Sequence, residues 1–518
     1  MAKHPSSVGR RLLSGSVLQT GSLIAAAVAS FFLMPFVVHH IGDRLYGFWA
    51  LAGAVIGYYG LLDLGLSSAV SQYICIAIGR NEPSECRAIF NTALRIQSLL
   101  GGLALLATVA VAIATPWFCR SAADAVLFRQ VVIVLGINTA FLFPTKVYSG
   151  VLDAELRFDI QSGLAILGVA LRTGLIVAAI WAGGGLLALA WMSLLATLPV
   201  SALQIWCARR EAPWARIERE RIDSKRVKSL FSYSIYTFLT RIADILRFQV
   251  DPLVISGLIG LVAVTHYRIA GLFAQYYIQL ILVSMGMMQP VLSRLHGADD
   301  RDGVERAFFF GTKVALWLSI FVCCALIGWG KPFIGRWMGP QYLDAYLPLV
   351  VLSIAVLLDV SQQPSLALLY ATFKHRFYTY MNWTEGLLNL VFSLLLARPL
   401  GILGVALGTL IGAFFIRMVI QPWWVCKVSG IHYGRYMRFV LGNVLRSGCL
   451  MTVATAISIW GLRPSYPFLI ASAVCATALY ATGSWLFVFD RHERERLRNA
   501  LRSQQTQNPP GVGVTVAS

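Results

Sequence analysis

Long stretches without a charged side chain recur along this 518-residue chain. Residues 96–119, 269–293 and 464–489 each lack Asp, Glu, Lys and Arg over a length that lets one helix cross a bilayer. With 57% hydrophobic and 13% charged residues, the chain has more apolar side chains than a soluble domain buries in one core. We therefore expect it to fold in lipid as helices, which satisfy their own backbone hydrogen bonds in hydrocarbon.

Windows of about 20 apolar residues predict about fourteen transmembrane helices, and hence an all-α polytopic membrane protein. Lys3, Arg10 and Arg11 precede the first window, as in a signal peptide, but no convincing small-residue cleavage site follows. This stretch is therefore interpreted as the first membrane helix. The predicted helices lie at residues 13–38, 45–70, 88–114, 127–151, 160–182, 186–207, 229–256, 265–293, 307–330, 345–372, 377–397, 400–424, 437–461 and 465–489.

The basic residues are divided unequally between the two sides of the membrane. A net charge of +19 would suggest nucleic acid in a soluble protein, but these residues lie mostly between and beside apolar segments, so no nucleic-acid partner is expected. If the N-terminus is cytoplasmic, 27 Lys or Arg lie on the cytoplasmic side and 7 on the other. The positive-inside rule then predicts both termini in the cytoplasm and contacts with anionic membrane lipids. We expect a multi-pass protein of a bacterial inner membrane. Fourteen and twelve spans both satisfy this rule.

A basic segment divides the predicted helices into groups of six and eight. Residues 209–228 contain 8 basic and 4 acidic side chains, which favours a solvated helix against lipid headgroups over a regulatory role. We expect an N-terminal lobe, this cytoplasmic linker, a C-terminal lobe, two further helices and a cytoplasmic tail that is partly disordered. Their ranges are 1–208, 209–228, 229–425, 426–490 and 491–518.

The two lobes share a faint internal repeat. Its members, at offsets of 217 and 218 residues, are Pro35, Ile41-Gly42 and Tyr58-Tyr59, which recur as Pro252, Ile259-Gly260 and Tyr276-Tyr277. Residues of these types are common here, but the nearly constant offset supports a duplicated unit. Because a unit of six helices preserves orientation, the lobes are expected to be related by an axis along the membrane normal, with a central cavity between them.

The sequence carries no pattern typical of an enzyme or of a metal or cofactor site. It has no GxxxxGK[ST] phosphate loop and no CxxC pair, and its nine cysteines lie largely inside apolar runs. Every loop expected on the outer side is short, the longest being about residues 331–344. Transport without catalysis is therefore the preferred interpretation, with no cofactor and no metal.

The first predicted hairpin, Pro35 to Ile74, has a distinctive pattern. An apolar helix ends before Ile41-Gly42, and then follow Tyr46-Gly47 and Leu62-Asp63-Leu64-Gly65. This pattern resembles the Wzx-type polysaccharide and O-antigen flippases, the polysaccharide transporter branch of the multidrug/oligosaccharidyl-lipid/polysaccharide (MOP) exporter superfamily. The detailed match covers about 40 residues, roughly two bilayer spans, while the division into six and eight helices agrees over most of the chain.

The resemblance implies a MATE-like bundle of two six-helix lobes around a central cavity, with two additional C-terminal helices. It further implies that undecaprenyl-pyrophosphate-linked oligosaccharide is moved to the periplasmic leaflet, for lipopolysaccharide or exopolysaccharide. Polysaccharide polymerase and chain-length machinery are the further partners that it implies.

Charged residues inside the predicted spans indicate an anionic cargo, since nine are basic and five acidic. Each costs on the order of 3 kcal/mol at a helix centre, so it should face water, protein or a partner. Arg95, Lys313 and Arg446 lie close enough to predicted cytoplasmic ends to reach the headgroups, and Arg268 lies near the outer end. The remaining candidates for binding the substrate are Lys146, Arg172, Arg241, Arg247 and Arg417.

The acidic residues in the spans are candidates for coupling to a proton or sodium gradient. Three of them have no base at helical spacing, and an isolated buried carboxylate takes up a proton or a cation. For Asp63 a structural hydrogen bond to a helix end is an equal alternative. The steps between Arg241, Asp244, Arg247 and Asp251 place these four on one helical face, where they can neutralise one another or line the cavity. The coupling candidates are Asp63, Asp244, Asp251, Asp359 and Glu385.

Two other functions compete with the flippase. A cation-coupled drug exporter of the MATE type shares the expected fold, but excess buried positive charge suits organic cations poorly. An integral-membrane glycan polymerase or ligase usually requires a larger outer loop than any found here.

Overall fold

The computed structural model describes residues 5–63, 66–118, 121–218, 242–243, 246–247, 249–286, 288–372, 374, 376–459, 465–491 and 493–495. Within these ranges every regular element is helical. The elements are α1 (Pro5–Ile41), α2 (Asp43–Gly57), η1 (Tyr58–Asp63), α3 (Leu66–Gly79), α4 (Pro83–Phe118), α5 (Ala122–Ala154), α6 (Phe158–Trp181), α7 (Leu186–Glu211), α9 (Asp251–Leu258), α10 (Leu261–Met285), α11 (Met288–Gly297), α12 (Arg301–Trp337), η2 (Pro340–Ala345), α13 (Tyr346–Val360), α14 (Gln363–Ala371), α15 (Arg376–Leu400), α16 (Ile402–Ala413), η3 (Phe414–Ile420), α17 (Gln421–Ser429), α18 (Tyr433–Ile459) and α19 (Tyr466–Phe487).

The all-α polytopic fold expected from the apolar windows is confirmed. In the described part of the chain, 12 helical spans are long and apolar enough to cross a membrane. The 25-residue α15 is absent from this set, because polar residues such as Asn382 and Glu385 lower its mean hydropathy. The span predicted at 229–256 lies mostly outside the described residues, and α9 is its described end. The expected number of about fourteen is thus consistent with the structure.

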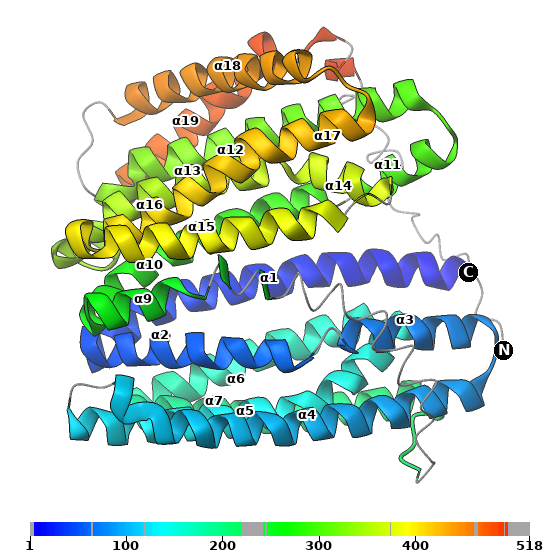
Figure 1. Cartoon of the computed structure of the whole chain (residues 1–518), viewed down its shortest axis with the longest axis vertical. Coiled ribbons are helices and arrows are strands. Elements are labelled where there is room, and N and C mark those ends of the chain that lie inside the picture. Colours follow the sequence, from blue (N-terminus) through cyan, green and yellow to red (C-terminus); the bar gives the residue numbers. More distant parts are fainter. Residues whose placement is uncertain are drawn as a thin grey trace, which may run out of the picture. The chain divides into compact units, whose positions relative to one another are not determined.

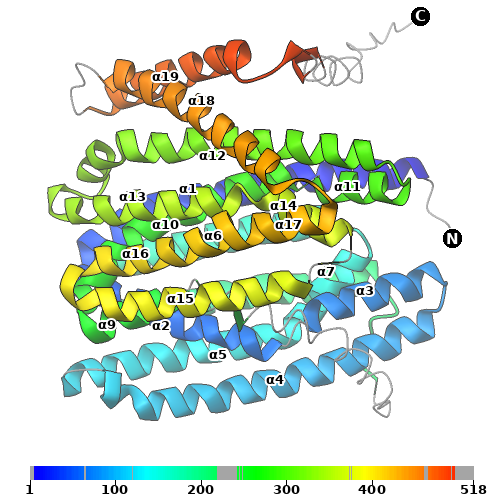
Figure 2. The same cartoon turned by 45° about the horizontal axis from the view of Figure 1, so that its top comes forward.

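The helices form two compact units. Unit 1 comprises Met1–Leu272 and Arg376–Gly412, and unit 2 comprises Phe273–His375 and Ala413–Ser518. In unit 1, α4 packs along α5, which packs in turn against α7, and α1 lies along α6 (Figure 1). In unit 2, α12 packs against α13 and α18, and α18 runs beside α19 (Figure 2). The predicted boundaries of the lobes, the linker and the tail stay predictions.

Several predicted spans are interrupted, and ionisable residues lie at the interruptions. The second predicted span is interrupted after α2 by the 3₁₀ turn η1, which ends at Asp63. α13 ends one residue after Asp359, and α14 begins nearby with Pro364 in its first turn. The helix that starts as α16 continues through the π-helical segment η3, which carries Arg417. π-Helical segments occur frequently at functional sites, so these interruptions direct attention to their charged residues.

The internal repeat corresponds to equivalent turns. Gly42 separates α1 from α2 and has a φ of 82°, while Gly260 separates α9 from α10 and has a φ of 139°. Both values lie in a region that glycine adopts without steric cost. The glycines of the repeat therefore serve the same purpose, which is to reverse the chain between two helices.

Helix α19 is aligned antiparallel to α12 by tryptophan side chains. Trp317 Nε1 donates to Ser484 Oγ and Trp329 Nε1 donates to Ser472 Oγ, each over 2.8 Å. The ring of Tyr480 stacks on that of Trp317 with the centroids 5.7 Å apart. Each step forward along α12 is matched by an equal step backward along α19, so the two helices have one defined register.

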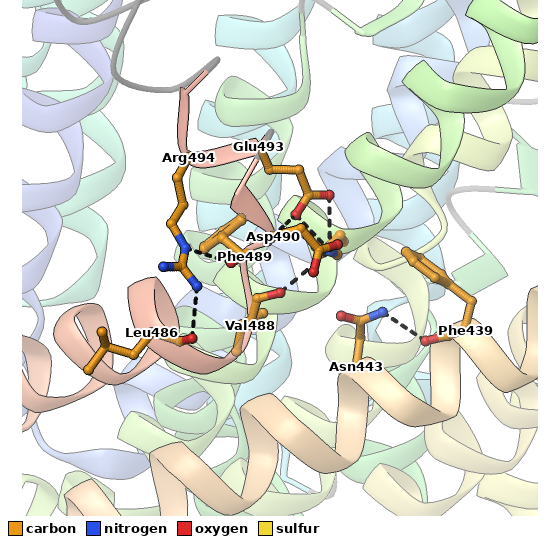
Figure 3. A network of polar contacts seen from close by, with 9 residues as sticks. Phe439, Asn443, Leu486, Val488, Phe489, Asp490, Glu493 and Arg494 are labelled. Atoms are coloured by element: carbon orange, nitrogen blue, oxygen red, sulfur yellow. Dashed lines mark hydrogen bonds and ion pairs between the residues drawn. The ribbon is translucent and has the colours of Figure 1, made fainter.

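The segment that follows α19 covers the side chain of Lys313. This lysine therefore does not extend to the lipid headgroups as expected. Lys313 was predicted to reach the headgroups, but it is only 5% exposed. Its Nζ lies 2.8 and 2.9 Å from the carboxylate oxygens of Glu493 and 3.4 Å from Asp490 Oδ2. Arg494 donates to the carbonyl groups of Leu486 and Phe489 and closes the turn (Figure 3). Asp490 and Glu493 lie far from Lys313 in the sequence, so helical spacing could not identify them as its partners.

Candidate functional site

In unit 1, Asp63 has a basic partner from a distant helix. Lys146 Nζ of α5 lies 3.4 Å from Asp63 Oδ1, and Gln97 Nε2 of α4 donates to the same oxygen over 2.7 Å. The Lys146 side chain is 38% exposed and lies over the ring of Phe143, at 4.6 Å from its centroid. The ammonium group is thus paired with the carboxylate but still accessible.

Arg247 and Glu385 form a buried ion pair in unit 1. Arg247 Nε lies 2.7 Å from Glu385 Oε1, and the two side chains are 8% and 2% exposed. Asn389, one turn after Glu385 on α15, donates to the Arg247 carbonyl over 3.2 Å. Removing either charge would leave the other buried and uncompensated, which is strongly destabilising.

Asp251 is buried among neutral hydrogen-bond donors. Tyr267 O–H donates to Oδ2 over 2.6 Å, and Asn389 Nδ2 lies 3.4 Å from Oδ1. The Thr409 hydroxyl lies 3.4 Å from Oδ2, 3.2 Å from Asn389 Oδ1 and 3.5 Å from the carbonyl oxygen of Val405. Its single proton can satisfy only one of these oxygens. Within the described residues, Asp251 has no basic partner.

In unit 2, Arg417 and Asp359 join two interrupted helices. Arg417 Nε lies 3.0 Å from Asp359 Oδ1, and the side chains are 1% and 9% exposed. Arg417 also donates to Gln421 Oε1 over 2.7 Å, and Gln421 donates to the Gln362 carbonyl over 3.3 Å. Gln362 lies at the break between α13 and α14, so the pair and its amide neighbours tie this break to the π-helical segment.

Arg172 differs from the other described candidates because it is exposed. It lies near the middle of the 24-residue helix α6. Within the described residues its guanidinium has no hydrogen bond or ion pair. Arg241 and Asp244 lie outside the described residues, and helix α9 begins only at Asp251.

The sequence identified the charged residues but not their partners. Asp63 lies 83 residues from Lys146, and Glu385 lies 138 residues after Arg247. Tyr267, Asn389 and Thr409 were not among the candidates, and the only signal for the last two was polar side chains inside apolar spans. The described residues contain no group of three or more His, Cys, Asp or Glu that could hold a metal ion. The substrate-binding and ion-coupling roles stay predictions.

The same fold occurs in solved structures of membrane transporters. The chain covers 98% of an inward-facing multidrug resistance MATE family transporter of the MOP superfamily, with 80% of its own length, a TM-score of 0.69 and 16% identity. It also covers 98% of the lipid II flippase MurJ in an inward closed conformation, with 91% of its own length, a TM-score of 0.71 and 14% identity. The chain therefore shares the fold of these two membrane proteins.

Sequence comparison assigns the chain to one protein family. The profile described as "Polysaccharide biosynthesis protein" matches residues 42–347, more than half of the chain, so the chain belongs to the polysaccharide biosynthesis protein family. The membrane protein EpsK of Bacillus subtilis (strain 168), whose description is "uncharacterized", is 21% identical over 93% of this chain and 96% of its own length. The teichuronic acid biosynthesis protein TuaB of the same organism is 21% identical over 60% of this chain and 63% of its own length. The resemblance to the polysaccharide branch of the MOP superfamily is confirmed.

Proposed function

We propose that this chain is a flippase that moves undecaprenyl-pyrophosphate-linked oligosaccharide across the inner membrane by alternating access, for a surface polysaccharide. Three findings support the proposal: the polysaccharide biosynthesis family, a relative named for teichuronic acid biosynthesis, and a fold shared with a protein named as a lipid II flippase. Polymerase and chain-length machinery would act on the units that it delivers. The protein itself would transport without catalysis.

The observation that carries the proposal is the polysaccharide biosynthesis family, and Arg172 is the residue of the structure that best fits a binding role. A charge near the middle of a span costs on the order of 3 kcal/mol against lipid, so a guanidinium without an ion-pair partner in the described part of the chain should face a wet path. Arginine donates two parallel hydrogen bonds to phosphate oxygens, which suits a diphosphate headgroup. Lys146, 38% exposed, is the second accessible candidate, whereas Arg247 and Arg417 are held by carboxylates in this conformation.

A drug exporter remains the second candidate only because MATE transporters share the fold. An unpaired cationic side chain on the transport path would repel an organic cation and attract a diphosphate. The two functions therefore require substrates of opposite charge, and an experiment can distinguish them.

Complementation of a strain that lacks this gene and any redundant exporter tests the proposal. The strain should lose its surface polymer, accumulate lipid-linked units in the cytoplasmic leaflet and keep its resistance to cationic dyes. The unaltered protein should restore the polymer, R172A should restore about a tenth or less, because a charge-assisted phosphate contact is lost, and R172K should be intermediate. R129A, which alters an exposed arginine near the start of α5, is the matched control and should restore fully.

Intact polymer together with new dye sensitivity in the deletion strain would reject the flippase in favour of a drug exporter. Full restoration by R172A, at normal abundance in the membrane, would remove Arg172 from the binding role while leaving the function itself untouched.

A further inference from the structure

The chain that leaves α7 lies against the other helices of unit 1. Helix α7 ends at Glu211, and residues 212–218 follow as a turn and irregular chain. Ala212 and Ala215 are each 1% exposed and belong to a hydrophobic cluster with residues of α3, α4 and α5. We call residues 212–218 the strap. The first part of the predicted linker is therefore packed against helices, whereas a solvated helix was expected.

A buried asparagine of α4 binds the backbone of the strap. Asn91, which is 3% exposed, donates its Nδ2 to the Arg216 carbonyl over 3.0 Å and accepts the Glu218 N–H at Oδ1 over 2.9 Å. The side-chain amide thus pairs with a carbonyl and an N–H two residues apart, as a neighbouring β-strand does. Arg87 and Arg95 lie one turn of α4 on either side of Asn91, hence on the same helical face.

Both arginines of this face bind Glu218. Arg87 Nη1 lies 2.9 Å from Glu218 Oε1, and Arg95 Nη2 donates to the Glu218 carbonyl over 2.9 Å. Arg95 therefore binds the strap, whereas it was expected to reach the lipid headgroups. The Arg87 and Glu218 side chains are 36% and 42% exposed. An ion pair this accessible to water contributes little free energy, so another anion can replace the carboxylate.

We propose that Arg87 and Arg95 form a binding site for the phosphate group of an anionic phospholipid, and that Glu218 occupies this site while the strap is docked. A guanidinium group donates parallel hydrogen bonds to phosphate as well as to carboxylate. The start of α4 lies on the predicted inner side of the membrane, where the leaflet carries negative charge. The site thus has the charge and the expected location that a lipid headgroup requires.

An anionic leaflet then favours the undocked strap in two ways. A headgroup at the two arginines displaces Glu218. The released chain is also attracted to the leaflet, because residues 209–228 contain 8 basic and 4 acidic side chains. Both contacts stabilise only the undocked state, and such a difference in affinity is what shifts an equilibrium between two conformations. The strap is therefore a lipid-sensitive element of unit 1, whatever cargo the protein carries.

Thiol accessibility in lipid nanodiscs tests the site. A cysteine-free protein with Ala215→Cys as reporter is treated with a soluble maleimide. In phosphatidylcholine the reporter should label slowly, since residue 215 is buried in the docked strap. Replacing part of the lipid by phosphatidylglycerol should speed labelling about tenfold, as a ligand with that preference for the undocked state does. Inorganic phosphate added to phosphatidylcholine discs should have little effect, because it lacks the high local concentration of headgroups.

Substitution of the arginines separates the site from the general charge of the membrane. Arg87→Ala combined with Arg95→Ala should label fast and equally in both lipids, because neither Glu218 nor a headgroup is then bound. Glu218→Gln should label faster than the parent in phosphatidylcholine, since the ion pair is lost. Arg80→Ala, which alters an exposed arginine shortly before α4, is the matched control and should behave as the parent in both lipids.

Proteolysis of the unaltered chain provides a second measurement that does not depend on a variant folding well. The Arg216 carbonyl is hydrogen-bonded to Asn91 in the docked strap, so trypsin should cleave after Arg216 slowly in phosphatidylcholine and faster in phosphatidylglycerol. Equal cleavage and equal labelling in the two lipids would overturn the proposal. Slow labelling of the double arginine variant would also overturn it, and equal acceleration by inorganic phosphate would exclude a lipid as the occupant.

Discussion

At the scale of single residues, the acidic side chains inside the spans differ in what compensates their charge. Asp63, Asp359 and Glu385 each lie beside a base. Asp251 instead accepts hydrogen bonds from neutral groups, which solvate a carboxylate without neutralising it. A proton or a monovalent cation can supply the missing charge, so we infer that Asp251 is the strongest of the coupling candidates that the structure describes.

Asp251→Asn should abolish the dependence of transport on the coupling ion. In purified protein, sodium chloride should raise the unfolding temperature relative to choline chloride if sodium is the ion, because a ligand stabilises the state that binds it. Asp251→Asn should remove this shift, and Asp359→Asn should keep it. If sodium has no effect, the pH dependence of vesicle transport is compared instead. An unchanged dependence on both ions in Asp251→Asn would exclude the role.

At the scale of elements, one buried lysine joins α12 to the segment that follows α19. Lys313 is compensated by Glu493 and Asp490, of which Glu493 is 19% exposed and Asp490 is 78% exposed. Because an uncompensated buried charge is costly, Asp490 and Glu493 contribute to the stability of the folded unit.

Glu493→Gln combined with Asp490→Asn should destabilise the protein by on the order of 3 kcal/mol, because the ammonium of Lys313 then stays buried without a counter-charge. Thermal unfolding or limited proteolysis of the purified protein measures this. Adding Lys313→Met should restore most of the loss, since the charge itself is gone. Asp299→Asn removes an ion pair with Arg301 and should change the stability little, since the Arg301 and Asp299 side chains are 93% and 88% exposed. If Lys313→Met does not restore the stability, the buried charge of Lys313 is not what these carboxylates compensate.

At the scale of the whole molecule, the distribution of charge predicts which loops face the cytoplasm. The basic segments 80–87, 209–228 and 374–376 lie on the predicted inner side, and residues near Trp337 lie on the outer side. The helical fold is confirmed, while the orientation of the termini stays a prediction.

Single cysteines introduced next to Arg80, Lys225 and Arg376 should be protected from an impermeant thiol reagent added to intact cells, and one next to Trp337 should label. Permeabilised cells provide the control, since all four should then react. Labelling at position 225 from outside would reverse the predicted orientation.

Apolar length was sufficient to predict the helical class and most spans, because the bilayer acts on each segment separately. The family was predicted instead from the pattern between Pro35 and Ile74. The helix interruptions at Asp63 and Arg417 and the partners of the charged residues were not predictable. Lys146 meets Asp63, Arg247 meets Glu385 and Asp251 meets Thr409 only because distant helices pack together. Compensation of a buried charge depends on distance in space, and helical spacing reports only on neighbours within one helix. The sequence by itself therefore determined what kind of molecule this is, and the tertiary structure decided which of its charges remain accessible.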